Sequence, residues 1–331
     1  MHDSSAISPA IGDLRLEGAR AWLESLPAWA DAHLEPIAGD ASFRRYFRVV
    51  GDRDQAVLMD APPDREDTAP FLQVDAILRD AGVHAPAVLA TDIDDGFLLL
   101  EDLGDRLLRE ELDHNSAADW FPRLFTVLRS LALEADCGSL PFYDRHRLLE
   151  ELELFPRWYL ERHHALTLSC EDWDIWEDLC TRLIAQAHAQ PQVFVHRDFH
   201  SSNLLALPGG DIGVIDFQDA VRGPLCYDFV SLLWDRYIAW PRQRLEDWME
   251  AFRQQVADDT EPAEWRRWCD WMGLQRNLKV VGIFARLHYR DGKDGYLEMI
   301  PRFWQYLLDV LPHYPEFEGF ARLLDRLQCA P

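Results

Sequence analysis

Lysine is almost absent from this sequence of 331 residues. Lys279 and Lys293 are the only two, so 31 of the 33 basic residues are arginines. Basic residues are also scarce relative to acidic ones, because 58 aspartates and glutamates bring the formal net charge to −25. An acidic surface of this kind repels the phosphate backbone of nucleic acids. The composition therefore argues against a nucleic-acid-binding protein.

Cysteine pairs and long apolar runs are missing as well. The six cysteines form no Cys-x-x-Cys pair, which argues against a zinc site or a disulfide framework and fits a reducing compartment. The amino terminus lacks the basic flank and apolar core of a signal peptide. The longest apolar runs, such as Phe97 to Leu100, are far too short to span a membrane. We therefore expect a cytoplasmic protein with no membrane association and no obligate protein partner.

The remaining composition and periodicity predict an α+β fold. Apolar residues make up 48% and charged residues 27%, which is typical of a globular chain. Strands are expected at 43–50, 55–60, 86–91 and 96–100, with helices at 14–31 and 68–82. From residue 104 onward the spacing is mostly helical, with helices predicted at 116–135, 142–163, 171–189, 226–239, 243–257, 262–289 and 302–328. We expect an antiparallel-sheet lobe over residues 1–103 and a helical lobe over residues 104–331, with a ligand cleft between them.

One segment of the helical half carries chemically distinctive residues. An apolar strand over 193–195 runs into His196 and Asp198, and Asn203 follows five residues after that Asp. A hairpin is expected next, with its midpoint between Gly209 and Gly210, so Asn203 and Asp216 should face each other across its open end.

Three oxygen-bearing side chains at one strand end suit a hard cation such as Mg²⁺. Phosphoryl transfer uses this arrangement, because the metal neutralises the phosphates while a carboxylate orients the attacking hydroxyl and takes its proton. A lone His-x-Asp is usually a loop pair, and a lone Asp at a strand end usually forms a turn. The full His-x-Asp-x-x-x-x-Asn pattern with a second strand-ending Asp is far more specific, and it predicts a kinase.

The segments His196 to Asn203 and Val214 to Asp219 resemble the catalytic and metal-binding segments of the aminoglycoside phosphotransferase and choline-kinase-like enzymes. The resemblance runs from Gly39 to about Arg302 and implies a bilobal protein-kinase-like fold that uses ATP and Mg²⁺.

The resemblance also implies roles for single residues. Asp198 would be the catalytic base, and Asn203 and Asp216 would bind the metal. His200 would take the place of the protein-kinase lysine that contacts the transferred phosphate. His196 would hold the loop, and Asp228 would cap a helix.

Within that superfamily the chain is most similar to the bacterial cell-wall recycling kinases, which phosphorylate the anomeric hydroxyl of N-acetylmuramate and N-acetylglucosamine. Four stretches carry this likeness, at residues 39–48, 58–63, 101–105 and 275–282. The closer resemblance implies a small amino sugar as the phosphate acceptor.

The nucleotide-binding half departs from the family pattern. Only one glycine remains where kinases carry a glycine-rich loop, at Gly39 to Ser42. Met59 stands at the position of the lysine that holds the α- and β-phosphates, and the position of its glutamate partner offers Gln73 or Asp75. Either the protein is inactive or another cation does that work. For the second case we expect Arg44 or Arg45, which come after the turn at Gly39 to Ser42, because arginine grips phosphate oxygens in a fork.

Residues 98–104 match the hinge between the lobes of a kinase, and the adenine edge would there meet the backbone of Glu101 and Leu103. These backbone groups bind a ligand edge with almost any side chain, so the match is equally compatible with a strand end followed by a turn.

The sequence leaves the identity of the phosphate acceptor open. A carboxylated sugar such as N-acetylmuramate requires an arginine, and Arg236, Arg276 and Arg286 lie on helices of the expected substrate side. A cationic aminoglycoside or choline would instead require carboxylates and aromatic rings, which Glu150, Glu151, Glu153, Trp158 and Tyr159 could supply. A non-catalytic, nucleotide-binding pseudokinase is a third possibility, favoured by Met59 and disfavoured by the intact Asp198, Asn203 and Asp216.

Overall fold

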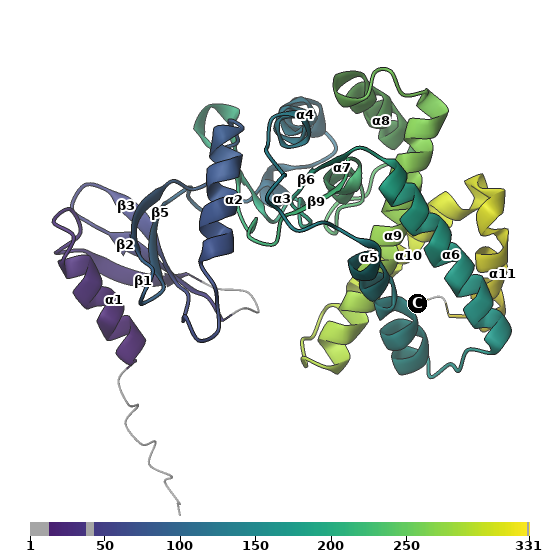
Figure 1. The fold of residues 1–331 in the computed structure, drawn as a ribbon, viewed down its shortest axis with the longest axis horizontal. Helices are drawn as coiled ribbons and strands as arrows, with labels where there is room; N and C mark the ends of the chain where they lie inside the picture. Colours follow the sequence, from purple (N-terminus) through teal and green to yellow (C-terminus); the bar gives the residue numbers. More distant parts are fainter. Residues whose placement is uncertain (1–12, 38–42, 330) are drawn as a thin grey trace, which may run out of the picture. The chain divides into compact units, whose positions relative to one another are not determined.

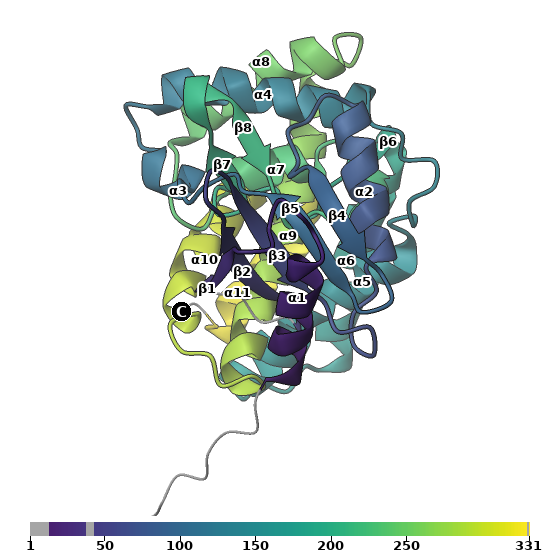
Figure 2. The same cartoon turned by 90° about the vertical axis from the view of Figure 1, so that its left-hand side faces the viewer.

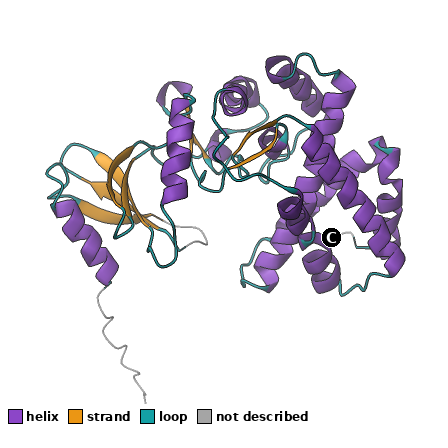
Figure 3. Cartoon of the chain, viewed as in Figure 1, coloured by secondary structure: helices purple, strands orange, loops and turns teal. Residues whose placement is uncertain are grey.

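The computed structural model describes residues 13–37, 43–329 and 331. The chain divides into two compact units, one formed by Met1–Asp75 and Pro86–Gly104, the other by Ala76–Ala85 and Asp105–Pro331. The first unit carries an antiparallel sheet and the second is mostly helical (Figure 3), which confirms the predicted α+β class.

The first unit is built on a five-stranded antiparallel sheet in the order β1-β2-β3-β5-β4. Four strands agree with those predicted from alternation, with the bounds β2 (Arg45–Val50), β3 (Gln55–Asp60), β4 (Val88–Asp92) and β5 (Phe97–Glu101). The edge strand β1 (His33–Ile37) was not predicted, because Pro36 and Glu35 break the apolar alternation that marks a strand.

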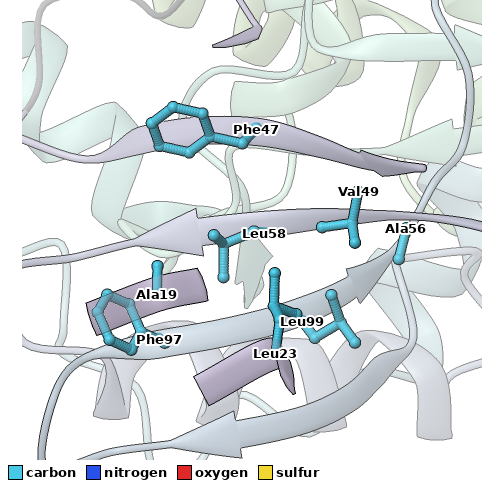
Figure 4. Close-up of a cluster of buried hydrophobic side chains, with 8 residues drawn as sticks. All are labelled: Ala19, Leu23, Phe47, Val49, Ala56, Leu58, Phe97 and Leu99. Carbon is cyan, nitrogen blue, oxygen red and sulfur yellow. The ribbon is translucent and has the colours of Figure 1, made fainter. Parts of the chain in front are cut away.

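Helix α1 (Leu14–Glu24) covers one face of this sheet. Ala19 and Leu23 of α1 pack on alternate residues of the strands, Phe47, Val49, Ala56, Leu58, Phe97 and Leu99 (Figure 4). The helix ends seven residues earlier than predicted, since Pro27 lacks the backbone N–H that a continuing helix needs. A further helix, α2 (Ala69–Asp80), follows β3.

The second unit is organised around α9 (Pro262–Tyr289), a helix of 28 residues that is buried along most of its length (Figure 1). The other helices are α3 (Leu108–Glu111), α4 (Ala117–Leu133), α5 (Arg145–Leu152), the π-helix η1 (Phe155–His163), α6 (Cys170–Ala189), α7 (Tyr227–Leu233), α8 (Arg242–Val256), α10 (Ile300–Val310) and α11 (Glu318–Leu327), with single 3₁₀ turns at Pro208–Gly210, Leu297–Met299, Leu311–His313 and Pro315–Phe317. None of the described helices combines the length and the apolar character needed to cross a membrane.

Two of the predicted long helices are interrupted. The stretch 302–328 is two helices, α10 and α11, because Pro312 and Pro315 interrupt the backbone hydrogen bonding between them. The stretch 142–163 is α5 followed by η1, whose first turn carries Pro156. Helix α7 stops at Leu233, six residues short of its predicted end.

Two short antiparallel pairs lie among these helices. Strand β6 (Gln192–Val195) pairs with β9 (Val221–Pro224), and β7 (Leu204–Ala206) pairs with β8 (Ile212–Val214). Helix α3 lies beside β7 (Figure 2). The loop between β6 and β7 and the residues after β8 carry the residues that the sequence singled out.

Candidate active site

The loop that follows β6 is fastened to α7 and to the segment after β8. The backbone N–H groups of His196 and Arg197 donate to the Asp228 carboxylate, at 2.6 and 3.0 Å. The His196 ring donates from Nε2 to the Ile215 carbonyl at 3.0 Å, so His196 holds the loop. Asp228 does not cap its own helix as predicted, because its carboxylate is turned to this loop. Burial raises the pKa of Asp228 to about 6.

Two residues of the site have left-handed backbone conformations. Arg197 has a φ of 77° and Asp216 a φ of 64°. Such conformations are costly for residues other than glycine and persist where the surroundings fix them. At Arg197 the hydrogen bonds from the backbone N–H groups of His196 and Arg197 to Asp228 supply that constraint. They fix the backbone immediately before Asp198.

The structure brings Asp198, Asn203 and Asp216 together. Nδ2 of Asn203 donates to the Asp198 carbonyl at 3.0 Å and to Oδ2 of Asp216 at 3.2 Å. The hairpin register differs by one residue from the prediction, since Ile215, not Asp216, pairs with Asn203. Its turn is a three-residue 3₁₀ turn at Pro208–Gly210, and the left-handed backbone of Asp216 brings its side chain back to Asn203.

Asp198 keeps its carboxylate available for chemistry. The side chain is exposed, and no described residue donates a hydrogen bond to its oxygens. Desolvation alone would raise the pKa of Asp198, but the positive charge of Lys279 outweighs it and holds this pKa below its usual range. The group is therefore ionised at neutral pH, as a proton acceptor must be.

His200, two residues on, is buried and lies against an arginine. Nη2 of Arg236 is 2.7 Å from Nε2 of His200, so that ring nitrogen accepts the bond. Burial, and then the charge of Arg236, hold the pKa of His200 well below its usual range. The ring is neutral, and its Nδ1 is buried without a partner among the described residues. His200 therefore lacks the charge of a lysine at this position, although Nδ1–H can still donate a hydrogen bond.

A buried ion cluster lies behind the loop. The Glu151 carboxylate on α5 accepts from Nη2 of Arg197 at 2.7 Å, from Nζ of Lys279 at 2.8 Å and from the Tyr143 hydroxyl. Burial raises the pKa of Glu151, but the two cations outweigh it and hold that pKa below its usual range. Lys279 was not predicted at the site, although the scarcity of lysine in the sequence was a signal that pointed to it.

The residues expected to bind Mg²⁺ fit that ion. Asp216 and Asn203 offer a carboxylate and an amide, and both side chains reach solvent. The described residues contain no group of three or more His, Cys, Asp or Glu side chains placed to hold a metal ion. A small donor set of this kind suits Mg²⁺, which usually binds one or two protein groups and completes its shell with water and substrate phosphates.

The first unit holds the residues expected to contact the nucleotide. Met59 is buried and lies opposite Tyr46 on β2, on the face of the sheet away from the α1 cluster. Arg44 pairs with Glu66 at 3.1 Å, and Arg45 pairs with Asp60 at 2.5 Å and with Asp13. Ser42 lies outside the described residues.

The predicted hinge contacts can be compared with the backbone at the end of β5. The N–H of Glu101 donates to the Ala87 carbonyl at 2.8 Å, so this group is already used. No described residue accepts from the N–H of Leu103. A ligand edge could therefore meet the Leu103 N–H, a donor that an adenine edge can use.

The three candidate substrate arginines separate into two groups. Arg236 lies against His200, and Arg276 is close enough to Asp198 and Arg236 for their charges to affect its pKa, which burial lowers. Arg286 is ten residues further along α9, which is about 15 Å along the helix axis. Its surroundings include Arg290 and Asp291, so it does not join the other two.

Comparison with known proteins agrees with this geometry. Residues 33–271 match the model of the phosphotransferase enzyme family. The chain belongs to that family. This phosphotransferase is 41% identical to the N-acetylmuramate/N-acetylglucosamine kinase of Pseudomonas aeruginosa, covering 95% of this chain and 97% of that protein. It is 39% identical to the protein of the same name from Neisseria meningitidis, covering 92% and 94%.

Solved structures show the same fold at low identity. Choline kinase LicA from Streptococcus pneumoniae matches with a TM-score of 0.63 and 13% identity, covering 90% of this phosphotransferase and 100% of that chain. The ADP-bound aminoglycoside phosphotransferase APH(2'')-Ib matches with a TM-score of 0.56 and 18% identity, covering 90% and 97%. The predicted kinase-like fold is thereby confirmed.

Proposed function

We propose that this phosphotransferase is an ATP-dependent kinase that phosphorylates the anomeric hydroxyl of N-acetylmuramate and N-acetylglucosamine during cell-wall recycling. Relatives that carry this activity in their names align over nearly the whole chain. The observation that carries the proposal is the ionised, unbonded Asp198 carboxylate beside the Asn203–Asp216 pair. In this assignment residues 1–103 form the nucleotide-binding lobe and residues 104–331 the catalytic and substrate-binding lobe, in the cytoplasm.

The reaction then follows from these groups. Asp198 accepts the proton of the sugar's anomeric hydroxyl as its oxygen attacks the γ-phosphorus of ATP. The bond between that phosphorus and the β,γ-bridging oxygen breaks, which gives the sugar 1-phosphate and ADP. The lowered pKa of Asp198 keeps it ready to accept that proton. His200 would contact the transferred phosphate, with the N–H of its neutral ring as the donor.

Asn203 and Asp216 would hold Mg²⁺, which supplies charge neutralisation at the phosphates when bound. The Glu101 carbonyl and the Leu103 N–H would receive the adenine edge. Arg44 or Arg45, following Ser42, would supply the cation that Met59 cannot.

A cationic acceptor is the weaker alternative. Of the side chains that could form its site, Glu151 is buried and already neutralised by Lys279 and Arg197. Tyr159 is fully buried and donates its hydroxyl hydrogen bond to the Cys329 carbonyl. Neither is available to cage an ammonium group, so two of the five side chains that the sequence suggested for an aminoglycoside or choline are already used within the protein.

The proposal is tested by measuring ADP release with N-acetylmuramate, N-acetylglucosamine, kanamycin and choline as acceptors. The amino sugars should be turned over and their phosphorus spectra should show a sugar 1-phosphate. The C1 methyl glycoside of N-acetylglucosamine should inhibit competitively without reacting, because its anomeric oxygen carries no proton. Phosphorylation of the blocked sugar, or preferred turnover of kanamycin or choline, would contradict the proposal.

A further inference from the structure

Three arginines converge on the segment that follows α7. Nη1 of Arg276 donates to the Trp234 carbonyl at 3.1 Å, and Nη1 of Arg302 donates to the Arg236 carbonyl at 2.7 Å. Arg236 itself reaches back to His200. Among the described residues, no carboxylate forms an ion pair with any of these three guanidinium groups.

This lack of counter-charge is unusual in a chain with a net charge of −25. Several other buried or half-buried arginines are paired, as Arg242 is with Asp270 at 2.6 Å. Arg276 is only 5% exposed, and a buried charge without a partner is costly. Asp198 and Asp235 act on it through space, but neither forms an ion pair with it, and the Asp235 carboxylate accepts the backbone N–H groups of Ser201 and Tyr237. The segment is thus suited to an anion supplied from outside the chain.

The position of these groups limits what the anion can be. His200 is two residues from Asp198, so an anion held by Arg236 would bind near the hydroxyl that Asp198 is proposed to deprotonate. The two sugars of the proposed function differ in one group, because N-acetylmuramate carries a lactyl carboxylate on O3 where N-acetylglucosamine has a hydroxyl. O3 and the anomeric oxygen belong to the same ring, and a guanidinium group binds a carboxylate through paired hydrogen bonds.

We propose that Arg236 and Arg276 form a carboxylate subsite that binds the lactyl group of N-acetylmuramate and makes this sugar the preferred acceptor. This inference rests on the proposed function and adds to it the residues that distinguish the two sugars. Arg286 is not part of the subsite, because it lies about 15 Å further along α9.

Two other roles for these arginines predict different kinetics with the two sugars. Arg276 could serve only to satisfy the carboxyl end of α7, since it donates to the Trp234 carbonyl. Arg236 could contact the transferred phosphate, since it lies beside His200. Either role would affect both sugars equally, whereas a carboxylate subsite affects N-acetylmuramate alone.

The test compares kcat/KM for the two sugars in the full-length protein and in its Arg236→Gln and Arg276→Gln variants. Loss of a charged hydrogen bond should lower kcat/KM for N-acetylmuramate by about 10- to 100-fold. The value for N-acetylglucosamine should fall by a much smaller factor, since that sugar makes no such bond. Arg322→Gln on α11, an exposed arginine paired with Glu318, is the matched control and should leave both values unchanged.

A substrate-side measurement covers the case in which a variant fails to fold. With the unmodified enzyme, kcat/KM for the lactyl carboxamide of N-acetylmuramate should be lower than for N-acetylmuramate itself, by the same factor that the arginine variants lose with N-acetylmuramate. If kcat/KM fell equally for both sugars in the arginine variants, or if the carboxamide were as good a substrate as N-acetylmuramate, the subsite would be overturned and the proposed function would stand. Absence of turnover of either sugar by the unmodified enzyme would instead overturn the proposed function, and the subsite with it.

Discussion

Nζ of Lys279 on α9 lies 2.8 Å from Oε1 of Glu151 on α5. Arg197 reaches the same Glu151 oxygen at 2.7 Å, and Arg197 immediately precedes Asp198. One of only two lysines in the chain is therefore used to join the central helix to the loop that carries the proposed base. The pKa of Lys279 is raised, because the Glu151 charge outweighs the desolvation that would lower it.

Glu151→Gln should destabilise the protein by about 3–5 kcal/mol, because it leaves two buried cations without their counter-charge. Turnover should fall as well, since Arg197 loses its anchor beside Asp198. Chemical denaturation and steady-state kinetics measure the two effects. Glu150→Gln, next to it on α5 but exposed and paired only with His146, should change the free energy of unfolding by no more than about 0.5 kcal/mol. Equal effects of the two variants would contradict this account of the cluster.

Asp198→Asn should lower kcat by about 10² to 10⁴ while ATP binding stays within a few-fold. The change removes the proton acceptor and preserves the shape of the side chain. Single-turnover rates and a separate titration with ATP distinguish the two quantities. Nearly unchanged turnover would refute the assignment of Asp198 as the base.

The pKa of about 6 for buried Asp228 predicts a pH dependence of stability. Between about pH 4 and pH 6 the folded protein retains a proton that the unfolded chain releases. The free energy of unfolding should therefore fall as pH rises through this window, by about 3 kcal/mol relative to Asp228→Asn, which has no proton to lose. Urea denaturation of both proteins from pH 4 to pH 7.5 measures the difference, and a difference that does not change with pH would contradict the prediction.

Gly282 marks the closest approach of α9 to the segment before η1. A Cβ placed there would lie 2.4 Å from the carbonyl carbon of Leu154 and 2.6 Å from the backbone nitrogen of Phe155. Gly282→Ala should therefore destabilise the protein by about 1–3 kcal/mol, although alanine is the better helix former. Gly319→Ala on α11, whose Cβ would meet only Ile175 at 4.0 Å, should leave stability unchanged or raise it. Thermal unfolding of both variants checks the contrast.

The sequence predicts those parts of the structure that depend on local pattern. Strands β2 to β5 follow from short apolar segments bounded by turn residues, and the loop at His196 to Asn203 follows from residue spacing. The predicted register of the β7–β8 hairpin was wrong by one residue. Turns of three and of four residues are hard to distinguish in the sequence Pro208-Gly209-Gly210-Asp211. The contact of Lys279 with Glu151 joins residues 128 positions apart, and only packing of α5 on α9 determines it.

The final prediction concerns the cation that replaces the lysine expected at Met59. Arg45 shares its face of the sheet with Phe47 of the α1 cluster, and it is bound to Asp60 and Asp13. The Asp60 side chain is 1% exposed, so Arg45→Ala should act mainly on stability by weakening the neutralisation of a buried carboxylate.

Arg44 stands two positions after Ser42 in the sequence and pairs with Glu66. Arg44→Ala should weaken ATP binding by about 2 kcal/mol, the range of a lost charged hydrogen bond. Adenosine binding should change much less, because adenosine has no phosphates to lose. Calorimetric titration with both ligands, alongside thermal unfolding of each variant, separates the effect on phosphates from the effect on folding. If both single variants and the double variant keep the ATP affinity of the parent, neither arginine replaces the lysine, and the Asn203–Asp216 metal site must hold the triphosphate without them.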